Sequence, residues 1–225
     1  LKQFATLTSE AQARELQATI AALQSQINPH FLYNSLDSIN WLARRGDVQK
    51  TTEMVTALTT FFRIGLSKGK DLITVREEVE HVRSYLVIQK IRYESQFDYS
   101  FYVDPETEQY FVPKLILQPL VENALYHGIK LCDRKCLLMI QVLARENEIE
   151  IEVLDNGAGM DEETLQSVRE AMEHTGENRT NSYGVVNVND RIRILAGPQY
   201  GLSFTSEKDV GTSAKIVLPK TLKGA

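Results

Sequence analysis

The sequence is short of cysteine, and it lacks long apolar runs and long basic runs. Its two cysteines, Cys132 and Cys136, imply no disulfide framework and favour a reducing compartment. Their C-x-x-x-C spacing near His127 can be read as a metal site, but complete sites usually show paired C-x-x-C or H-x-x-H spacings. No apolar run reaches the length of a bilayer span.

Positive charge is also in short supply. The 225 residues carry 25 lysines and arginines against 30 acids, which gives a net charge of −5 and disfavours broad binding to nucleic acid. An apolar fraction of 43% is typical of a globular protein with one large or two modest domains. Because the chain begins with Leu1, we expect it to be a piece of a longer protein.

The first hundred residues show the spacing of helices. Apolar or seam positions step by four and three through Leu16, Ile20, Leu23, Ile27, His30, Asn34, Asp37 and Trp41. This heptad pattern predicts a helix that packs against other helices in a bundle. The seam turns polar at His30, and Pro29 just before it removes a backbone donor, so we expect the helix to bend there and expose the imidazole.

Two further helices follow. The segment around Gly46 predicts a hairpin turn, and helical spacing resumes from Thr51 to Leu66 and from Val75 to about Glu94. The pattern then changes, and the rest of the chain predicts helices over a mixed sheet. The expected strands are Phe97 to Val103, Leu137 to Ala144, Glu148 to Leu154, Leu202 to Ser206 and Ser213 to Leu218, and the expected helices are Pro113 to His127, Asp161 to Glu173 and Val185 to Leu195.

The predicted fold class is therefore α+β, with two parts that meet near residue 95. Residues 1–95 are expected to form a helical domain, and residues 96–225 an α/β domain built in layers.

A turn motif follows one predicted strand. In Leu154-Asp155-Asn156-Gly157-Ala158-Gly159-Met160, a carboxylate at the strand end can accept from an amine, and two glycines let the backbone approach a ligand. Alone this motif is weak, because an ordinary tight turn would look the same.

Three other motifs accompany it. Leu117 to Gly128 reads LQPLVENALYHG, an apolar helix whose polar residues Glu122, Asn123 and His127 should face a ligand or a cation rather than be buried unpaired. Ser182 to Arg191 predicts a glycine-containing loop that leads into a helix, whose first amides would point at phosphates. Gly211 and Thr212 precede the last strand.

In this order the four motifs resemble the boxes of the GHKL ATP-binding fold, which gyrase, MutL and the histidine kinases share. The resemblance becomes closer with QINPHFLYNSL (residues 26–36) and YLVIQKIRY (residues 85–93). The chain is similar to the cytoplasmic catalytic portion of sensor histidine kinases of the LytS/YesM type, over about Leu23 to Leu218. The resemblance implies a helical dimerisation and phosphotransfer domain, followed by an α/β sandwich that binds ATP.

The resemblance also implies roles for individual residues. His30 would attack the γ-phosphate of ATP, with Asn34 one turn along the same helix face, where an amide could position water for dephosphorylating the partner. Asn123 would hold Mg²⁺, and Asp155 would accept from the adenine amine. The remaining nucleotide-binding residues would be His127, Gly157, Gly159, Gly184, Asn187, Gly211 and Thr212, with residues 161–182 as a lid.

The chain departs from the family pattern at two places. Many histidine kinases carry an acid directly after the phosphorylated histidine, where this chain has Phe31, so Glu122 is the candidate general base. The second glycine box usually reads G-x-G, where this chain has Ser182-Tyr183-Gly184, which should alter nucleotide affinity or lid closure.

Other functions of the same fold fit less well. A gyrase-like ATPase holds a water-activating glutamate one turn before the magnesium asparagine, where this chain has Pro119. A serine kinase of the anti-sigma type would lack the long helical part. A catalytically silent nucleotide-binding scaffold stays open as the alternative.

The resemblance finally implies partners and a location. We expect a homodimer built on the helical part, phosphotransfer to an aspartate of a response regulator, and an upstream membrane-anchored sensor. The chain would then be the cytoplasmic portion of a cell-membrane protein in a two-component system.

Overall fold

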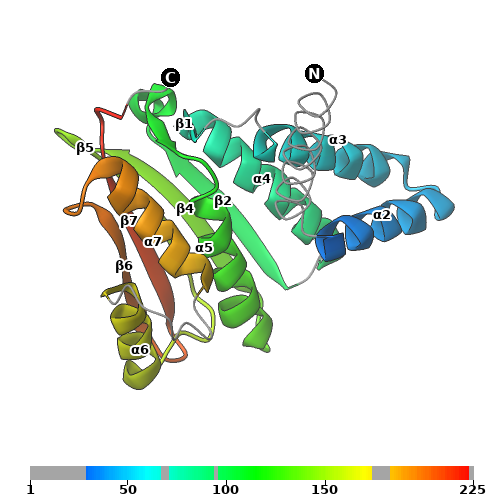
Figure 1. The fold of residues 1–225 in the computed structure, drawn as a ribbon. Coiled ribbons are helices and arrows are strands. Elements are labelled where there is room, and N and C mark those ends of the chain that lie inside the picture. The colour runs from blue at the N-terminus through cyan, green and yellow to red at the C-terminus, as the bar shows by residue number, and fades with distance from the viewer. Residues whose placement is uncertain (1–28, 67–70, 94–95, 174–182, 223–225) are drawn as a thin grey trace, which may run out of the picture.

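The computed structural model describes residues 29–66, 71–93, 96–173 and 183–222, which form a helical half and a sheet half (Figure 1). The helical half contains three helices: α2 (Pro29–Arg44), α3 (Val48–Gly65) and α4 (Val75–Arg92). The sheet half contains β2 (Phe97–Val103), β4 (Cys136–Ala144), β5 (Glu148–Asp155), β6 (Gly201–Glu207) and β7 (Gly211–Pro219). The predicted α+β class and the mixed sheet are confirmed.

The five strands lie in the order β2-β4-β5-β7-β6, with β2 parallel to β4 and every other pair antiparallel. Strand β5 turns one face toward the core and the other away from it. Its Ile149, Ile151 and Val153 point into the core, while the glutamates between them are only partly buried. This alternation is what the sequence predicted for residues 148–154.

Helices cover one face of the sheet (Figure 1). They are α5 (Leu117–Asn123), which runs into a π-helix at Ala124–Gly128 and a 3₁₀ turn at Ile129–Leu131, together with α6 (Glu162–Glu173) and α7 (Tyr183–Ala196). The π turn contacts the loop that follows β5, where the Gly128 carbonyl accepts from the Ala158 amide at 3.1 Å.

The predicted start of this helix at Pro113 is wrong. Pro113 instead ends strand β3 (Phe111–Pro113), where it pairs with Leu72 of strand β1 (Leu72–Thr74). The chain then turns through Leu115, which has a positive φ of 59°, so the helix cannot begin before residue 117. The proline in the first turn is Pro119 rather than Pro113.

The helical hairpin is formed as predicted. Gly46 takes a φ of 73° after α2, and the Asp47 carboxylate accepts from the Lys50 amide at the start of α3. Helix α4 starts with a capping box between Thr74 and Glu77.

One hydrophobic core runs through both halves. It includes Phe61 and Tyr85 of the helical half together with Leu120 and Ile140 of the sheet half. The β1–β3 ribbon also joins residues from either side of position 95. The division of the chain into domains at residue 95 stays a prediction.

The predicted heptad seam of α2 does not face this core. His30 and Trp41 are exposed, whereas Phe31, Ser35 and Leu42 on the opposite side of α2 are buried. The seam residues before position 29 lie outside the described residues. So does Ser25, whose carbonyl was expected to lose its helical donor at Pro29, and the predicted bend depends on that loss.

Candidate functional site

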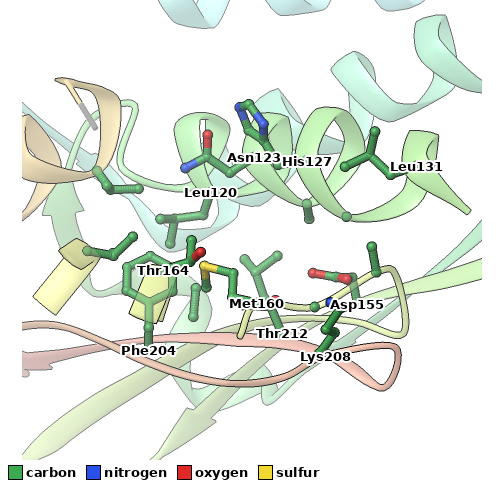
Figure 2. A pocket seen from close by; sticks show the side chains of 18 of the residues that line it. Leu120, Asn123, His127, Leu131, Asp155, Met160, Thr164, Phe204, Lys208 and Thr212 are labelled. Atoms are coloured by element: carbon green, nitrogen blue, oxygen red, sulfur yellow. The ribbon is translucent and has the colours of Figure 1, made fainter. Parts of the chain in front are cut away.

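A cavity of about 670 Å³ lies between the α5 side of the fold and the ends of strands β5, β6 and β7. Figure 2 shows Leu120, Asn123 and His127 on the helix side and Asp155, Lys208 and Thr212 on the strand side; the Leu120 side chain points toward the strands, and those of Asn123 and His127 do not. Its wall is mostly apolar, with side chains from Leu120, Ala124, Leu131, Val153, Met160, Val168, Phe204 and Ala214. A flat, apolar group with a few polar edges would fit such a cavity.

Asp155 provides a partly buried carboxylate at this cavity. Burial raises the pKa of its carboxyl to about 6, although hydrogen bonds from the backbone of Gly157 and Thr212 act in the opposite direction. The Gly157 amide donates to Oδ1 at 2.8 Å. A carboxylate has about four acceptor positions, so it can still accept hydrogen bonds from a ligand in the cavity.

Two glycines let the backbone pack closely around Asp155. A Cβ added to Gly128 would lie 2.7 Å from Asp155 Oδ1, and one added to Gly157 would lie 2.5 Å from the carbonyl carbon of Gly128. Any side chain at either position would therefore displace the carboxylate or the π turn. Gly157 shapes the cavity from behind and does not line it.

Two other glycines fasten the loop after β5 to the β6–β7 hairpin. Gly159 has a φ of 63° and Gly211 one of 143°, and an added Cβ would meet backbone oxygens at 1.9 Å and 2.0 Å. The Asp209 amide donates to the Ala158 carbonyl at 2.6 Å across the same contact. Gly159 lines the cavity, and Gly211 supports it.

Asn123 and His127 line the cavity from the helix side. The described residues contain no cluster of three or more histidine, cysteine or acidic side chains that could hold a metal ion. A metal in this cavity would therefore take few protein ligands. That fits Mg²⁺, which binds one or two protein oxygens and completes its shell with water and phosphate oxygens. The Asn123 side-chain oxygen is suited to this role.

Besides Gly157 and Gly211, the predicted residues Asn187 and Glu122 do not line the cavity. Asn187 is exposed on α7 and does not line it. Glu122 faces α4, because its carboxylate interacts with Tyr85 and His81 of that helix, and Gln118 Nε2 donates to its Oε1 at 2.9 Å. Burial is the main cause that raises the pKa of Glu122, against hydrogen bonds from Gln118 and Tyr85. Gly184 and Thr212 line the cavity, while residues 174–182 of the predicted lid, Ser182 among them, fall outside the described residues.

His30 lies on α2, in the helical half. Its ring is exposed, and Asn34 Nδ2 lies 3.0 Å from its Nε2. The amide donates into that nitrogen, so the ring proton sits on Nδ1. The expectation that His30 and Asn34 share one face of the helix is thus met in the structure.

Sequence reasoning missed several residues of the cavity. Lys208 and Asp209 come from the β6–β7 turn, and Met160 and Thr164 come from the loop and helix after Asp155. The charged turn directly before Gly211 was a usable signal for Lys208, because a hairpin beside a glycine box must lie near the same ligand. Met160 ends the turn motif and Thr164 lies in the predicted lid, but neither was given a role of its own.

Two known families match the chain. The family described as "Histidine kinase" matches residues 18–97, and the family described as "Histidine kinase-, DNA gyrase B-, and HSP90-like ATPase" matches residues 112–222.

Individual proteins are similar over almost the whole chain. "Sensor histidine kinase YesM" of Bacillus subtilis is 36% identical over 97% of the chain, and "Sensor protein LytS" of Bacillus cereus is 34% identical over 94%. The chain spans 37% and 36% of the length of these two relatives. A solved histidine kinase domain from Erythrobacter litoralis EL346 is 19% identical, covers 94% of this chain and 97% of its own, and gives a TM-score of 0.49. Among the described residues, no helix is long and apolar enough to cross a membrane.

Proposed function

Since the chain belongs to the sensor histidine kinases that resemble YesM and LytS, we propose that it binds ATP in this cavity and transfers the γ-phosphate to His30. The observation that carries the proposal is the partly buried Asp155 carboxylate, which lines a mostly apolar cavity and can still accept hydrogen bonds. An adenine ring has the matching features, because its faces are apolar and its exocyclic amine donates.

The remaining cavity residues support the binding of the triphosphate. Lys208 offers a positive charge at the cavity, and Gly184 near the start of α7 leaves space for phosphate oxygens. Gly159, Thr212 and His127 line the same cavity and would contact the nucleotide. Asn123 would hold Mg²⁺, which would neutralise charge on the phosphates when it is bound.

The chemical step would be phosphoryl transfer to nitrogen. A ring nitrogen of His30 would attack the γ-phosphorus, a nitrogen–phosphorus bond would form, and the bond to the bridging oxygen would break and release ADP. The exposed ring of His30 supports this role, because a large donor complex can reach it. Attack by Nε2 would require the Asn34 amide to leave the nitrogen that it now occupies.

The proton that leaves the imidazole needs an acceptor. Phe31 cannot provide one, and Glu122 is the candidate because burial moves its pKa upward, toward the range of a useful base. Its carboxylate now faces α4 and contacts Gln118, so it would have to turn toward the cavity to act.

The same proposal includes partners and location. His30 would pass its phosphate to an aspartate carboxylate of a response regulator. The outer face of α2 exposes Tyr33, Leu36 and Trp41, which supports a homodimer through the helical half. An upstream membrane-anchored sensor would place this chain on the cytoplasmic side. Asn34 would position water for dephosphorylation of the regulator.

A catalytically silent scaffold is the second candidate. The departure from a G-x-G sequence at residues 182–184 is the feature that keeps it open, because it should alter nucleotide affinity or lid closure.

Labelling with γ-labelled ATP and Mg²⁺ tests both candidates. We expect an acid-labile, alkali-stable label on the wild-type chain and none on His30→Gln or Asn123→Ala. Nucleotide binding by His30→Gln should be unchanged, because His30 lies outside the cavity. If the wild-type chain binds ATP and takes no label even with the upstream helix intact, the scaffold is the right assignment.

A further inference from the structure

Helix α4 buries a stripe of polar side chains where it meets the sheet half. Glu78, His81, Tyr85 and Gln89 recur every three or four residues on one face, and each is only 1% exposed. Helix α4 packs against α3 on one side and α5 on the other. Apolar side chains at this contact would avoid the desolvation cost of burying polar groups. These polar groups therefore indicate a contact whose geometry is set by hydrogen bonds.

His81 sits at the centre of this contact. Its Nδ1 lies 3.1 Å from the carbonyl oxygen of Phe61 on α3, and its Nε2 lies 2.9 Å from Oε1 of Gln118 on α5. Gln118 uses its other end, since its Nε2 donates to Glu122 Oε1 at 2.9 Å. A line of polar contacts within hydrogen-bonding distance therefore runs from α3 through α4 to the residue that precedes Asn123.

Aromatic contacts extend this line to α2. The ring of Phe31 lies 5.0 Å from the ring of Phe61 and 5.4 Å from that of Tyr85. Phe61 in turn stacks on His81, with 4.3 Å between ring centroids and an angle of 15° between the planes. The residue after His30 is thus connected to the residue before Asn123 through packed and hydrogen-bonded side chains.

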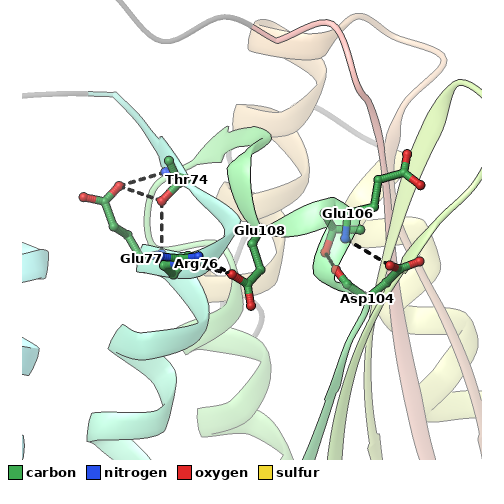
Figure 3. A network of polar contacts seen from close by, with 7 residues as sticks. Thr74, Arg76, Glu77, Asp104, Glu106 and Glu108 are labelled. Atoms are coloured by element: carbon green, nitrogen blue, oxygen red, sulfur yellow. Dashed lines mark hydrogen bonds and ion pairs between the residues drawn. The ribbon is translucent and has the colours of Figure 1, made fainter.

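The same two halves also meet through an exposed polar contact (Figure 3). Arg76 of α4 pairs with Glu108 of the 3₁₀ turn Pro105–Gln109 at 2.5 Å, and the Arg76 side chain is 71% exposed. An exposed ion pair of this kind contributes little and tolerates other geometries. It provides a matched control, because it joins the halves and does not touch His81.

We propose that His81 and Gln118 are positioning residues that transmit the placement of α2 to the orientation of the Glu122 carboxylate, and so set the rate of phosphoryl transfer to His30. This inference deepens the proposed function and rests on it. We call the connected side chains Phe31, Phe61, His81, Gln118 and Glu122 the interhelix relay.

The physical reason is that the relay members cannot shift one at a time. Loss of one partner leaves another buried polar group without its hydrogen bond, which costs about 1–3 kcal/mol. The Phe61 ring must also slide with His81, since the two are in stacked contact. A movement of α2 is therefore passed on to Gln118 and is not absorbed locally.

Kinetics of His30 labelling provide the first test. Gln118→Met keeps the side-chain length and removes both hydrogen bonds, and we expect the labelling rate at saturating ATP to fall about tenfold, within the usual range of coupling effects. The ATP concentration for half-maximal rate should stay within about twofold, because Gln118 lies outside the cavity. His81→Gln should retain most of the rate, since its amide can still contact Gln118. Arg76→Gln should behave as wild type.

Amide hydrogen exchange provides a second test that needs no kinase activity. Phe31→Leu keeps an apolar side chain and removes the ring contacts, and we expect exchange in residues 117–123 to rise about tenfold through easier local opening. In a Gln118→Met background the same change should add little. Arg76→Gln should leave this segment unchanged.

The results separate the two proposals. Three results would each overturn the relay. They are an unchanged labelling rate in Gln118→Met, an equal loss of ATP affinity and labelling rate in that variant, and hydrogen exchange in α5 that is the same in Phe31→Leu as in wild type. A wild-type chain that binds ATP and takes no label would refute the proposed function, and the exchange experiment would still decide whether α2 and α5 are coupled.

Discussion

Two carboxylates that are shielded from solvent, Glu78 and Asp155, have different surroundings. At the contact between α4 and α5, Glu78 accepts from the backbone amides of Leu115 and Leu117, both at 2.8 Å. Burial raises the pKa of Glu78, against the nearby His81 and these amides. In the cavity, Asp155 has backbone partners on one side and open space on the other.

The difference indicates what each carboxylate is for. Glu78 closes the start of α5, with one oxygen on each of two amides, and so holds a helix in place. Asp155 keeps acceptor positions that the protein itself does not use, although keeping them costs solvation energy. A buried carboxylate that faces an open cavity is better explained by a ligand than by stability.

Replacing each carboxylate by its amide should give the largest difference between the two sites. For Asp155→Asn we expect the affinity for ATP to fall about 100-fold, because a charged hydrogen bond worth about 3 kcal/mol is lost. For Glu78→Gln we expect the affinity to hold, and the free energy of unfolding to fall by about 1–3 kcal/mol as one amide loses its acceptor. Calorimetric titration and denaturant unfolding measure the two quantities.

The contrary result is easy to recognise. Equal loss of affinity in both variants would mean that Asp155 supports the fold rather than the ligand.

Gly128→Ala sharpens the comparison, because it should move the Asp155 carboxylate without changing its chemistry. The new Cβ would lie 2.7 Å from Oδ1, and the overpacking should cost about 2 kcal/mol, or about 30-fold in ATP affinity. Gly46→Ala is the control, since its Cβ would meet nothing within 4 Å. Its positive φ should lower stability by about 1 kcal/mol and leave nucleotide binding intact. Tolerance of alanine at residue 128 would show that the carboxylate can move freely.

The pH dependence of binding should give the smallest effect. The folded pKa of Asp155, about 6, is raised above its ordinary value of 3.8, so the stability that this group contributes is fully present below pH 3.8 and is lost as the pH rises through 6. Binding has the opposite sign, because only the carboxylate accepts from the amine.

We expect the affinity for ATP to fall about tenfold between pH 7.5 and pH 5, in proportion to the ionised fraction. Titration of wild type and Asp155→Asn side by side removes the contribution of the phosphates themselves. Parallel profiles in the two proteins would assign the pH dependence to another group.

The sequence predicted most of the regular elements, because their patterns are local. The alternation at residues 148–154 and the glycine after α2 each carry the whole signal within one segment. Strands β1 and β3 were missed, since each has only three residues and its partner lies about forty positions away. The start of α5 was misplaced because Pro113 fits a first helical turn and an extended ribbon equally well.

The residues of the site also fall into those that a local motif marks and those that it does not. Asp155 and Gly159 belong to one motif and could be located from it, whereas Lys208 and Phe204 reach the cavity from a different strand pair. The contact of His81 with Gln118 joins residues 37 positions apart on two helices, and each of them looks ordinary within its own segment.

The β1–β3 ribbon determines which segments of the chain could be exchanged between related proteins by recombination. A recombinant that crosses over at residue 95 would take Leu72–Thr74 from one parent and Phe111–Pro113 from the other, so the two strands would have to pair across unrelated sequences. A crossover ahead of residue 71 keeps the ribbon and α4 with the sheet half, and leaves only the α2–α3 hairpin to be replaced. The ribbon therefore ties α4 to the sheet half, although its helical pattern groups it with α2 and α3.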